Sequence, residues 1–112
     1  MSSTYIPDQG DIVWLQFNPQ KGHEQAGHRP ALIISPKSYN RRVGLALLCP
    51  ITSKSKGYPF EVELDVETIN GVVLSDQVKS LDWQARRAEY AGSAPSQVME
   101  EVRAKLSTLI FG

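Results

Sequence analysis

Short apolar runs separated by glycine and proline predict that most of this chain is β-structure. Residues 60–64 alternate between apolar and acidic side chains, so we expect the apolar ones to face inward. Residues 31–34 are all apolar, a pattern typical of a strand buried on both faces. We expect a turn at Asn70-Gly71. The remaining predicted strands cover residues 11–17, 43–52, 72–74, 77–81 and 86–90.

The spacing of apolar residues changes from about Pro95 to the end of the chain. They then recur at three- and four-residue steps, at Val98, Met99, Val102, Leu106, Leu109 and Ile110. This period predicts an amphipathic helix, which Pro95 can open and Gly112 can end. Five to seven short strands followed by one helix predict a mainly β fold, a small barrel with a C-terminal α-helix. At this length we expect residues 1–112 to form a single domain.

The composition argues against a secreted scaffold held together by disulfides and against a membrane-spanning protein. The chain has one cysteine, Cys49, so it cannot form an internal disulfide, and the apolar run around Cys49 predicts that its side chain is buried. Its first residues lack the basic and apolar regions of a signal peptide, and no run approaches the roughly 18 apolar residues of a membrane span. We therefore expect a cytoplasmic protein with no membrane partner.

The formal net charge of zero hides an uneven distribution of charge. Residues 18–60 carry seven basic side chains and one acidic side chain, a local balance of +6, whereas residues 1–17 carry −2 and residues 61–112 carry −4. A basic half can attract an anionic partner even when the whole chain is neutral. Charge alone does not decide between such a footprint and an ordinary solvated surface.

The densest group of reactive side chains lies in residues 21–30, where two glycines and a proline predict a loop. The segment holds a lysine, two histidines, a glutamate and an arginine. Its histidines stand five positions apart, not the four that place two zinc ligands on one helix face. Because the chain has no third histidine and its one cysteine is expected to be buried, we predict neither a metal site nor a cofactor.

The same segment suits cleavage of RNA at its own 2′-hydroxyl. That reaction needs a base for the hydroxyl proton, donors for the charge on the phosphorane, and an acid for the leaving oxygen. Arg29 offers a fork of charged donors, Glu24 could act as the base, and His28 could move protons near neutral pH. Thr52, at the end of a predicted strand, could donate its hydroxyl to a phosphoryl oxygen. Taken singly, a residue such as Arg29 is more often a surface cation, one such as His28 a loop residue, and one such as Thr52 a strand-end residue that hydrogen-bonds its neighbours.

Residues 52–60 form a second candidate binding segment. They combine Lys54 and Lys56 with two aromatic residues. A single nucleic-acid strand needs this mixture, because its phosphates attract cations and its bases stack on rings. The same composition also occurs where a loop needs only solubility and packing.

Four motifs, in this order along the chain, resemble the MazF/PemK family of toxin endoribonucleases. They are Gly10-Asp11-Ile12-Val13-Trp14, Lys21-Gly22-x-Glu24-Gln25-x-Gly27-His28-Arg29-Pro30, Pro50-Ile51-Thr52-Ser53 and Ser75-Asp76-Gln77-Val78-Lys79. The resemblance covers essentially the whole chain and is strongest over residues 5–81. It implies an SH3-like β-barrel of the CcdB/MazF type that forms a homodimer. It further implies a sequence-specific toxin that cleaves single-stranded RNA, including mRNA, and so inhibits translation and growth.

The resemblance also carries a chemistry, a partner and a set of residues. It implies metal-independent cleavage that leaves a 2′,3′-cyclic phosphate and a 5′-hydroxyl, and neutralisation by a cognate antitoxin. By position, Arg29 and Thr52 correspond to the catalytic pair, with Glu24 beside them. The residues that fall where the family lines its RNA groove are His28, Lys56, Asp76, Gln77 and Lys79. We add Ser53 and Lys54 from the basic loop as further RNA-binding residues.

The sequence alone leaves open the identity of the general base, the choice between catalysis and binding, and the nature of the antitoxin. A guanidinium group is permanently charged and is a poor base, so we expect Arg29 to stabilise charge on the phosphate while Glu24 or His28 takes the proton. A toxin of the same fold that binds DNA gyrase, or a non-catalytic RNA-binding barrel, is an alternative function. An antitoxin would be expected to be acidic, because it must complement the +6 segment.

Overall fold

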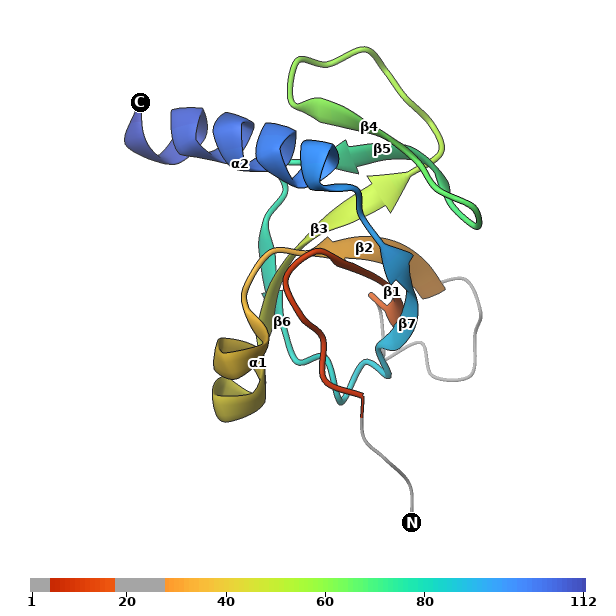
Figure 1. The fold of residues 1–112 in the computed structure, drawn as a ribbon, viewed down its shortest axis with the longest axis vertical. Coiled ribbons are helices and arrows are strands. Elements are labelled where there is room, and N and C mark those ends of the chain that lie inside the picture. The colour runs from red at the N-terminus through yellow and green to blue at the C-terminus, as the bar shows by residue number, and fades with distance from the viewer. Residues whose placement is uncertain (1–4, 18–27) are drawn as a thin grey trace.

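The computed structural model describes residues 5–17 and 28–112, and its main feature is a strongly curled antiparallel β-sheet (Figure 1). The strands are β1 (Asp11–Gln16), β2 (His28–Ile33), β3 (Ala46–Thr52), β4 (Glu61–Asp65), β5 (Asn70–Leu74), β6 (Lys79–Leu81) and β7 (Glu89–Ser93). The helices are α1 (Lys37–Val43) and α2 (Ser96–Phe111). Strands are paired in the order β4-β5-β3-β2-β1-β7, and β6 also pairs with β3. The predicted mainly β fold with a C-terminal helix is confirmed.

The central strands are buried on both faces because successive residues enter two different hydrophobic clusters. In β2, Leu32 packs into one cluster, which α2 joins through Val102. Ala31 and Ile33 point the other way, into a second cluster that includes Trp83. All three β2 residues have no exposed surface. This two-sided burial explains why the strand lacks alternation in the sequence, as predicted.

Strand β3 is paired along both of its edges. One edge pairs with β2, while on the other edge residues 46–48 pair with β6 and residues 51–52 pair with β5. Cys49 and Pro50 lie between the segment that pairs with β6 and the segment that pairs with β5. Proline has no N–H to donate to a ladder. Residues 75–78 leave the sheet opposite this interruption, so the strand predicted from residue 77 begins only at Lys79.

Strand β5 approaches β3 closely at Gly71. A β-carbon on Gly71 would lie 2.2 Å from the carbonyl oxygen of Thr52, so a larger residue would displace the backbone. The turn expected at Asn70-Gly71 is therefore wrong, because both residues belong to β5. The chain reverses just before them, where the N–H of Val66 donates to the carbonyl of Ile69 (3.0 Å).

Several other boundaries differ from the expectation, and β2 begins at His28, not at residue 31. Residues 37–43 form α1 where no helix was predicted, and β3 consequently begins at Ala46, not at residue 43. Asn40 is the one buried residue of α1, so the helix has no apolar stripe that periodicity could reveal. Strand β7 begins at Glu89, not at residue 86, because the Asp82 carboxylate accepts the N–H groups of residues 84 and 85 and holds a turn there. Neither helix in the described ranges is long and apolar enough to cross a membrane.

Asn40 joins three separate parts of the chain through buried hydrogen bonds. Its side-chain amide donates to the carbonyls of Pro7 (2.8 Å) and Ser35 (3.0 Å). The Ser35 hydroxyl donates to Asn40 Oδ1, and Trp83 Nε1 donates to the Asn40 carbonyl (3.0 Å). The N-terminal segment, α1 and the turn before β7 are therefore tied together at one residue, through its side chain and its backbone carbonyl.

We expect Asn40→Ala to lower the free energy of unfolding by about 2–4 kcal/mol, because it leaves buried polar partners without a hydrogen bond. Urea unfolding followed by circular dichroism measures this change. Ser38→Ala is the matched control, since Ser38 is exposed on the same helix and should stay within about 0.5 kcal/mol of the wild type. Equal stability of the two variants would show that Asn40 is not a structural hub.

Candidate active site

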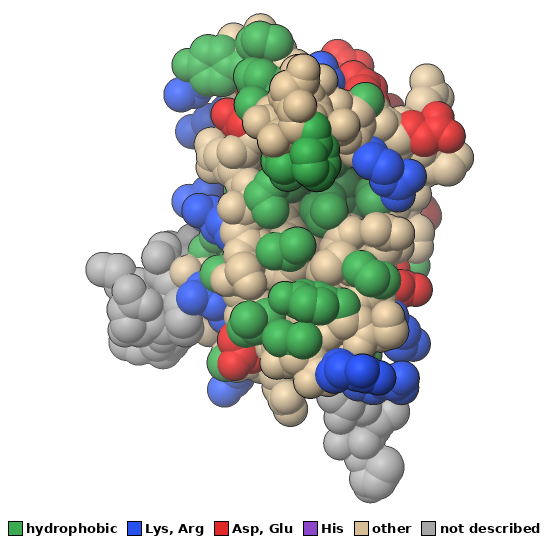
Figure 2. All heavy atoms as spheres, turned by 90° about the vertical axis from the view of Figure 1, so that its left-hand side faces the viewer, with side chains coloured by type: hydrophobic (Ala, Val, Ile, Leu, Met, Phe, Trp, Pro, Cys, Tyr) green, Lys and Arg blue, Asp and Glu red, His purple; other side chains and the backbone are tan. Residues whose placement is uncertain are grey.

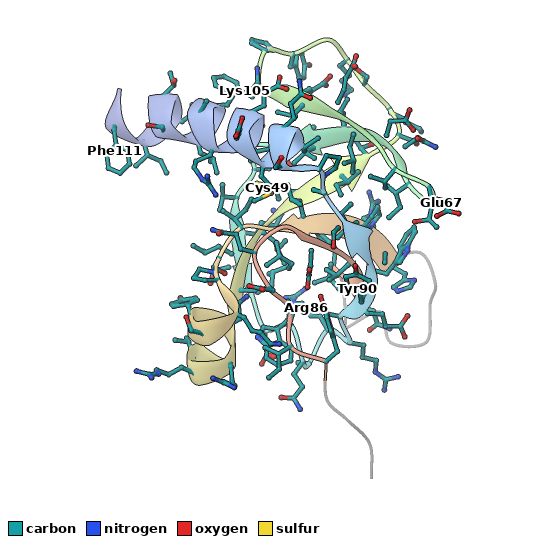
Figure 3. All side chains as sticks on the ribbon, viewed as in Figure 1. Cys49, Glu67, Arg86, Tyr90, Lys105 and Phe111 are labelled. Atoms are coloured by element: carbon teal, nitrogen blue, oxygen red, sulfur yellow. The ribbon has the colours of Figure 1, made fainter. Side chains whose placement is uncertain are left out.

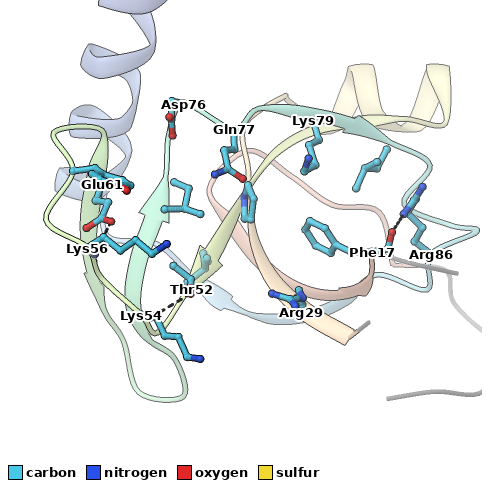
Figure 4. A pocket seen from close by; sticks show the side chains of 15 residues that line it. Phe17, Arg29, Thr52, Lys54, Lys56, Glu61, Asp76, Gln77, Lys79 and Arg86 are labelled. Carbon is cyan, nitrogen blue, oxygen red and sulfur yellow. Dashed lines mark hydrogen bonds between the residues drawn. The ribbon is translucent and has the colours of Figure 1, made fainter. Parts of the chain in front are cut away.

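A cavity of about 670 Å³ opens where the ends of β2 and β3 meet the loops 53–60 and 75–78 (Figure 4). Most of the site residues expected from the sequence line it: Arg29, Thr52, Lys54, Lys56, Asp76, Gln77 and Lys79. Ser53 lines a neighbouring cavity of about 390 Å³ that also includes Arg29, Thr52 and Lys54. The fold thus brings residues from three of the four motifs to one place.

Strand register explains why Arg29 and Thr52 share this cavity. Ala31 of β2 pairs with Pro50 of β3, and the same antiparallel register continued by two residues places Arg29 opposite Thr52. Residues opposite one another on antiparallel strands project to the same face of the sheet. Thr52 is half-buried, and its oxygen accepts the N–H of Lys54 (3.2 Å), which leaves its hydroxyl hydrogen available to donate.

The charged residues that line the larger cavity are predominantly basic. Its cationic residues are Arg29, Lys54, Lys56, Lys79 and Arg86, and its acidic residues are Glu61 and Asp76. Two of the cations, Lys79 and Arg86, come from the half of the sequence that is acidic overall. The positive character of the cavity therefore results from the fold as well as from the basic first half of the chain. Such a lining favours a ligand that carries several negative charges.

The carboxylate of Glu61 is occupied by the β3–β4 loop. It accepts hydrogen bonds from the Ser55 hydroxyl (2.7 Å) and from the N–H groups of Lys56 (2.9 Å) and Gly57 (3.1 Å). The N–H of Lys56, followed by the Ser55 hydroxyl, holds the pKa of the Glu61 carboxyl below its usual value. Glu61 is thus ionised at neutral pH, with its lone pairs directed at the loop.

The sequence analysis did not identify Phe17 and Arg86 as site residues. Arg86 Nη1 donates to the carbonyls of Gln16 (3.2 Å) and Phe17 (2.7 Å), and the N–H of Gln16 donates to the Arg86 carbonyl (2.9 Å). These bonds hold the end of β1, and Phe17 lies on the cavity wall beside Arg86 (Figure 4). No local signal could have revealed this contact, because its partners are about seventy positions apart in the sequence.

One expected site residue that the structure describes, His28, lines neither cavity. His28 precedes Arg29 in β2 and therefore points to the other face, where its ring lies 5.3 Å from the ring of Trp14. Glu24 lies outside the described residues.

Other catalytic groups find little support at this site. Burial raises the pKa of the Cys49 thiol to about 12, so the thiol is protonated at neutral pH and is a poor nucleophile. Within residues 5–17 and 28–112, no three histidine, cysteine, aspartate or glutamate side chains gather closely enough to hold a metal ion. The functional groups that the cavity does present include five cations and the hydroxyl of Thr52.

Comparisons with known proteins place this geometry in a family. A family model for the "PemK-like, MazF-like toxin of type II toxin-antitoxin system" matches residues 8–110. The endoribonuclease toxin MazF of Escherichia coli K12 is 49% identical over 110 residues, which cover 98% of this chain and 99% of the relative.

Solved structures that resemble this chain come from the same family. A crystal structure of MazF from Deinococcus radiodurans matches with a TM-score of 0.87 at 54% identity, over 97% of this chain and 100% of that chain. A MazE-MazF structure from the same organism matches with a TM-score of 0.85 at 49% identity, over 96% of this chain and 97% of that chain. Because the family model covers most of the chain and a relative of nearly half identity spans it, this chain belongs to the PemK/MazF family of type II toxins.

Proposed function

We propose that this protein is a single-domain endoribonuclease toxin that cleaves single-stranded RNA, including mRNA, by attack of the 2′-hydroxyl on the adjacent phosphate. One observation carries the proposal: Arg29 and Thr52 lie together in a cavity whose charged lining residues are mostly cationic. The relatives are endoribonuclease toxins, which supports the same activity. The cytoplasm, where mRNA is translated, is the location we propose.

In the proposed reaction the 2′-oxygen forms a bond to phosphorus as the bond to the 5′-oxygen breaks. The products are a 2′,3′-cyclic phosphate and a 5′-hydroxyl: a base takes the proton of the 2′-hydroxyl, the leaving 5′-oxygen takes up a proton from the solvent, and no metal is needed. The guanidinium of Arg29 and the hydroxyl of Thr52 donate to the phosphorane oxygens, where negative charge builds. Their placement on facing strands preorganises both donors, so little reorganisation is needed in the transition state.

The rest of the cavity suits a single strand of RNA. Lys54, Lys56 and Lys79 can accompany successive phosphates, and the rings of Phe17 and Tyr58 can stack on exposed bases. The remaining polar residues of the lining that we assign to RNA binding are Asp76 and Gln77, with Ser53 in the neighbouring cavity. A gyrase-binding toxin or a non-catalytic RNA-binding barrel would not require Arg29 and Thr52 to be paired.

We expect the purified protein to cleave a mixed single-stranded RNA in EDTA and to leave cyclic phosphate ends. Arg29→Ala and Thr52→Ala should each lower kcat by about 10²–10³, because each removes a donor to the phosphorane. Arg41→Ala is the control, because Arg41 is exposed on α1 and does not line the cavity, yet carries the same charge. Intact RNA in the wild-type reaction would favour one of the two binding functions.

We further propose that Glu24 takes the 2′-proton. The alternative base, His28, packs against Trp14 on the face of β2 opposite Arg29. A base that faces away from the phosphate cannot reach the attacking hydroxyl directly.

We expect Glu24→Gln to lower kcat by about 10²–10⁴, the usual contribution of a general base. His28→Gln should change kcat by less than about tenfold, because His28 would act only through packing. Steady-state cleavage at saturating RNA measures both values. A larger loss in His28→Gln than in Glu24→Gln would reverse the assignment.

The partners we propose are a second copy of the chain and an acidic antitoxin. Apolar side chains gather on the face that carries α1, β6 and the outer end of α2 (Figure 2). On these elements and β3, the exposed apolar residues include Val43, Leu47, Leu109, Ile110 and Phe111. Burying this face against its copy would remove it from water. The solved MazE-MazF complexes support an antitoxin partner, and the basic cavity suits an acidic one.

We expect the wild-type protein to sediment as a dimer at micromolar concentration and Ile110→Asp to shift it toward the monomer. Ile110 is 65% exposed in the single chain, so a carboxylate there should spare the fold and oppose only burial at an interface. Gln97→Asp, in the first turn of the same helix, adds the same charge away from this face and is the control. Unchanged sedimentation of Ile110→Asp would exclude this end of α2 from the interface.

A further inference from the structure

Glu61 is an acidic residue in a cavity that we propose binds a polyanion, and its presence there needs a reason. A free carboxylate at this place would repel phosphates. The structure shows instead that both of its oxygens are engaged by donors of the β3–β4 loop, residues 53–60. Its role is therefore to be found in the loop and not in direct contact with substrate.

The hydrogen bonds of Glu61 close the loop into a compact ring. The carboxylate takes the Ser55 hydroxyl and two successive N–H groups, and the N–H of Glu61 itself donates to the carbonyl of Tyr58 (3.1 Å). Gly57, with φ of 74°, adopts the left-handed conformation within this ring. The N–H of Gly57 also approaches the Ser55 hydroxyl at 3.4 Å.

Other parts of the fold anchor the far end of the same loop. Lys105 of α2 donates to the carbonyl of Pro59, and Figure 3 shows Lys105 on the side of the helix that faces the loop. The hydroxyl of Ser75 donates to the carbonyl of Phe60. Residues 54–57, which carry the two lysines, are held differently. Among the described residues, the side chains that accept their N–H groups belong to Thr52, to Ser55 within the loop and to Glu61.

We propose that Glu61 is a positioning residue that preorganises the β3–β4 loop, so that Lys54 and Lys56 are already placed for the phosphates of the RNA. The inference rests on the proposed endoribonuclease function and deepens it. Figure 4 shows Lys56 extending from beside Glu61 toward Thr52, across the cavity. If the loop were free, binding would have to order it, and the lost conformational entropy would weaken substrate affinity.

The proposal can be distinguished from simple electrostatics because the two predict opposite signs. Removing a negative charge from a cationic cavity should, by charge alone, tighten RNA binding. Removing the acceptor that holds the loop should, by contrast, weaken RNA binding. Glu61→Gln removes the negative charge and also one of the two acceptor oxygens. The glutamine amide keeps one acceptor oxygen but presents N–H groups to loop atoms that are themselves donors. The direction of the change in KM therefore decides between them.

The experiment is steady-state cleavage of an RNA oligonucleotide by the wild type, Glu61→Gln, Ser55→Ala and Glu63→Gln. We expect Glu61→Gln to raise KM about tenfold, equivalent to about 1.4 kcal/mol, with kcat changed less than about threefold. Ser55→Ala should raise KM to a smaller degree, because it removes one donor of three. Glu63→Gln is the matched control: Glu63 is exposed on the same strand, and no hydrogen bond between described residues involves its side chain.

Hydrogen exchange supplies a second readout that does not depend on activity. The amides of Lys56 and Gly57 should exchange faster in Glu61→Gln, while those of β2 and β3 stay protected. A KM at or below that of the wild type in both Glu61→Gln and Ser55→Ala, or unchanged exchange at these two amides, would overturn the positioning role. Failure of the wild type to cleave RNA would instead overturn the proposed function itself.

Discussion

The geometry of the site depends on the way β3 is paired. Its pairing with β2 brings Arg29 opposite Thr52, and its two partners on the other edge are separated by Pro50, which cannot donate to a ladder. The chain leaves the sheet at this interruption and carries Asp76 and Gln77 to the cavity. Gly71 completes the arrangement, because the absence of a side chain lets β5 come close to Thr52.

The same strand pairing brings charged side chains together at the cavity. The whole chain is neutral, yet the cavity combines five cationic side chains with two acidic ones. Glu61 has its lone pairs turned toward backbone and hydroxyl donors of the loop. Arg86 uses its guanidinium to hold the end of β1, which keeps Phe17 at the wall. Charged groups thus shape the cavity in addition to contributing to its potential.

Much of the fold and part of the site could be inferred before the structure was known. The strands with clear alternation or continuous burial, the terminal helix and the family agree with the structure and the comparisons. The starts of β3, β6 and β7 were misplaced, and the larger errors were α1, whose one buried residue is polar, and the turn expected at Asn70-Gly71. In both cases the local pattern gave the wrong signal because the decisive contacts, of Asn40 with Pro7 and of Gly71 with Thr52, lie far apart in the sequence.

The sequence by itself determined the fold class, the family and seven of the residues that line the cavity, because periodicity and motif spacing are local properties. The tertiary structure decided which of those residues meet. It placed Arg29 with Thr52, turned His28 toward Trp14, and added Phe17, Arg86 and Glu61 to the lining. The physical reason is strand register: a shift of one residue sends a side chain to the opposite face of a sheet, and only long-range pairing sets that register.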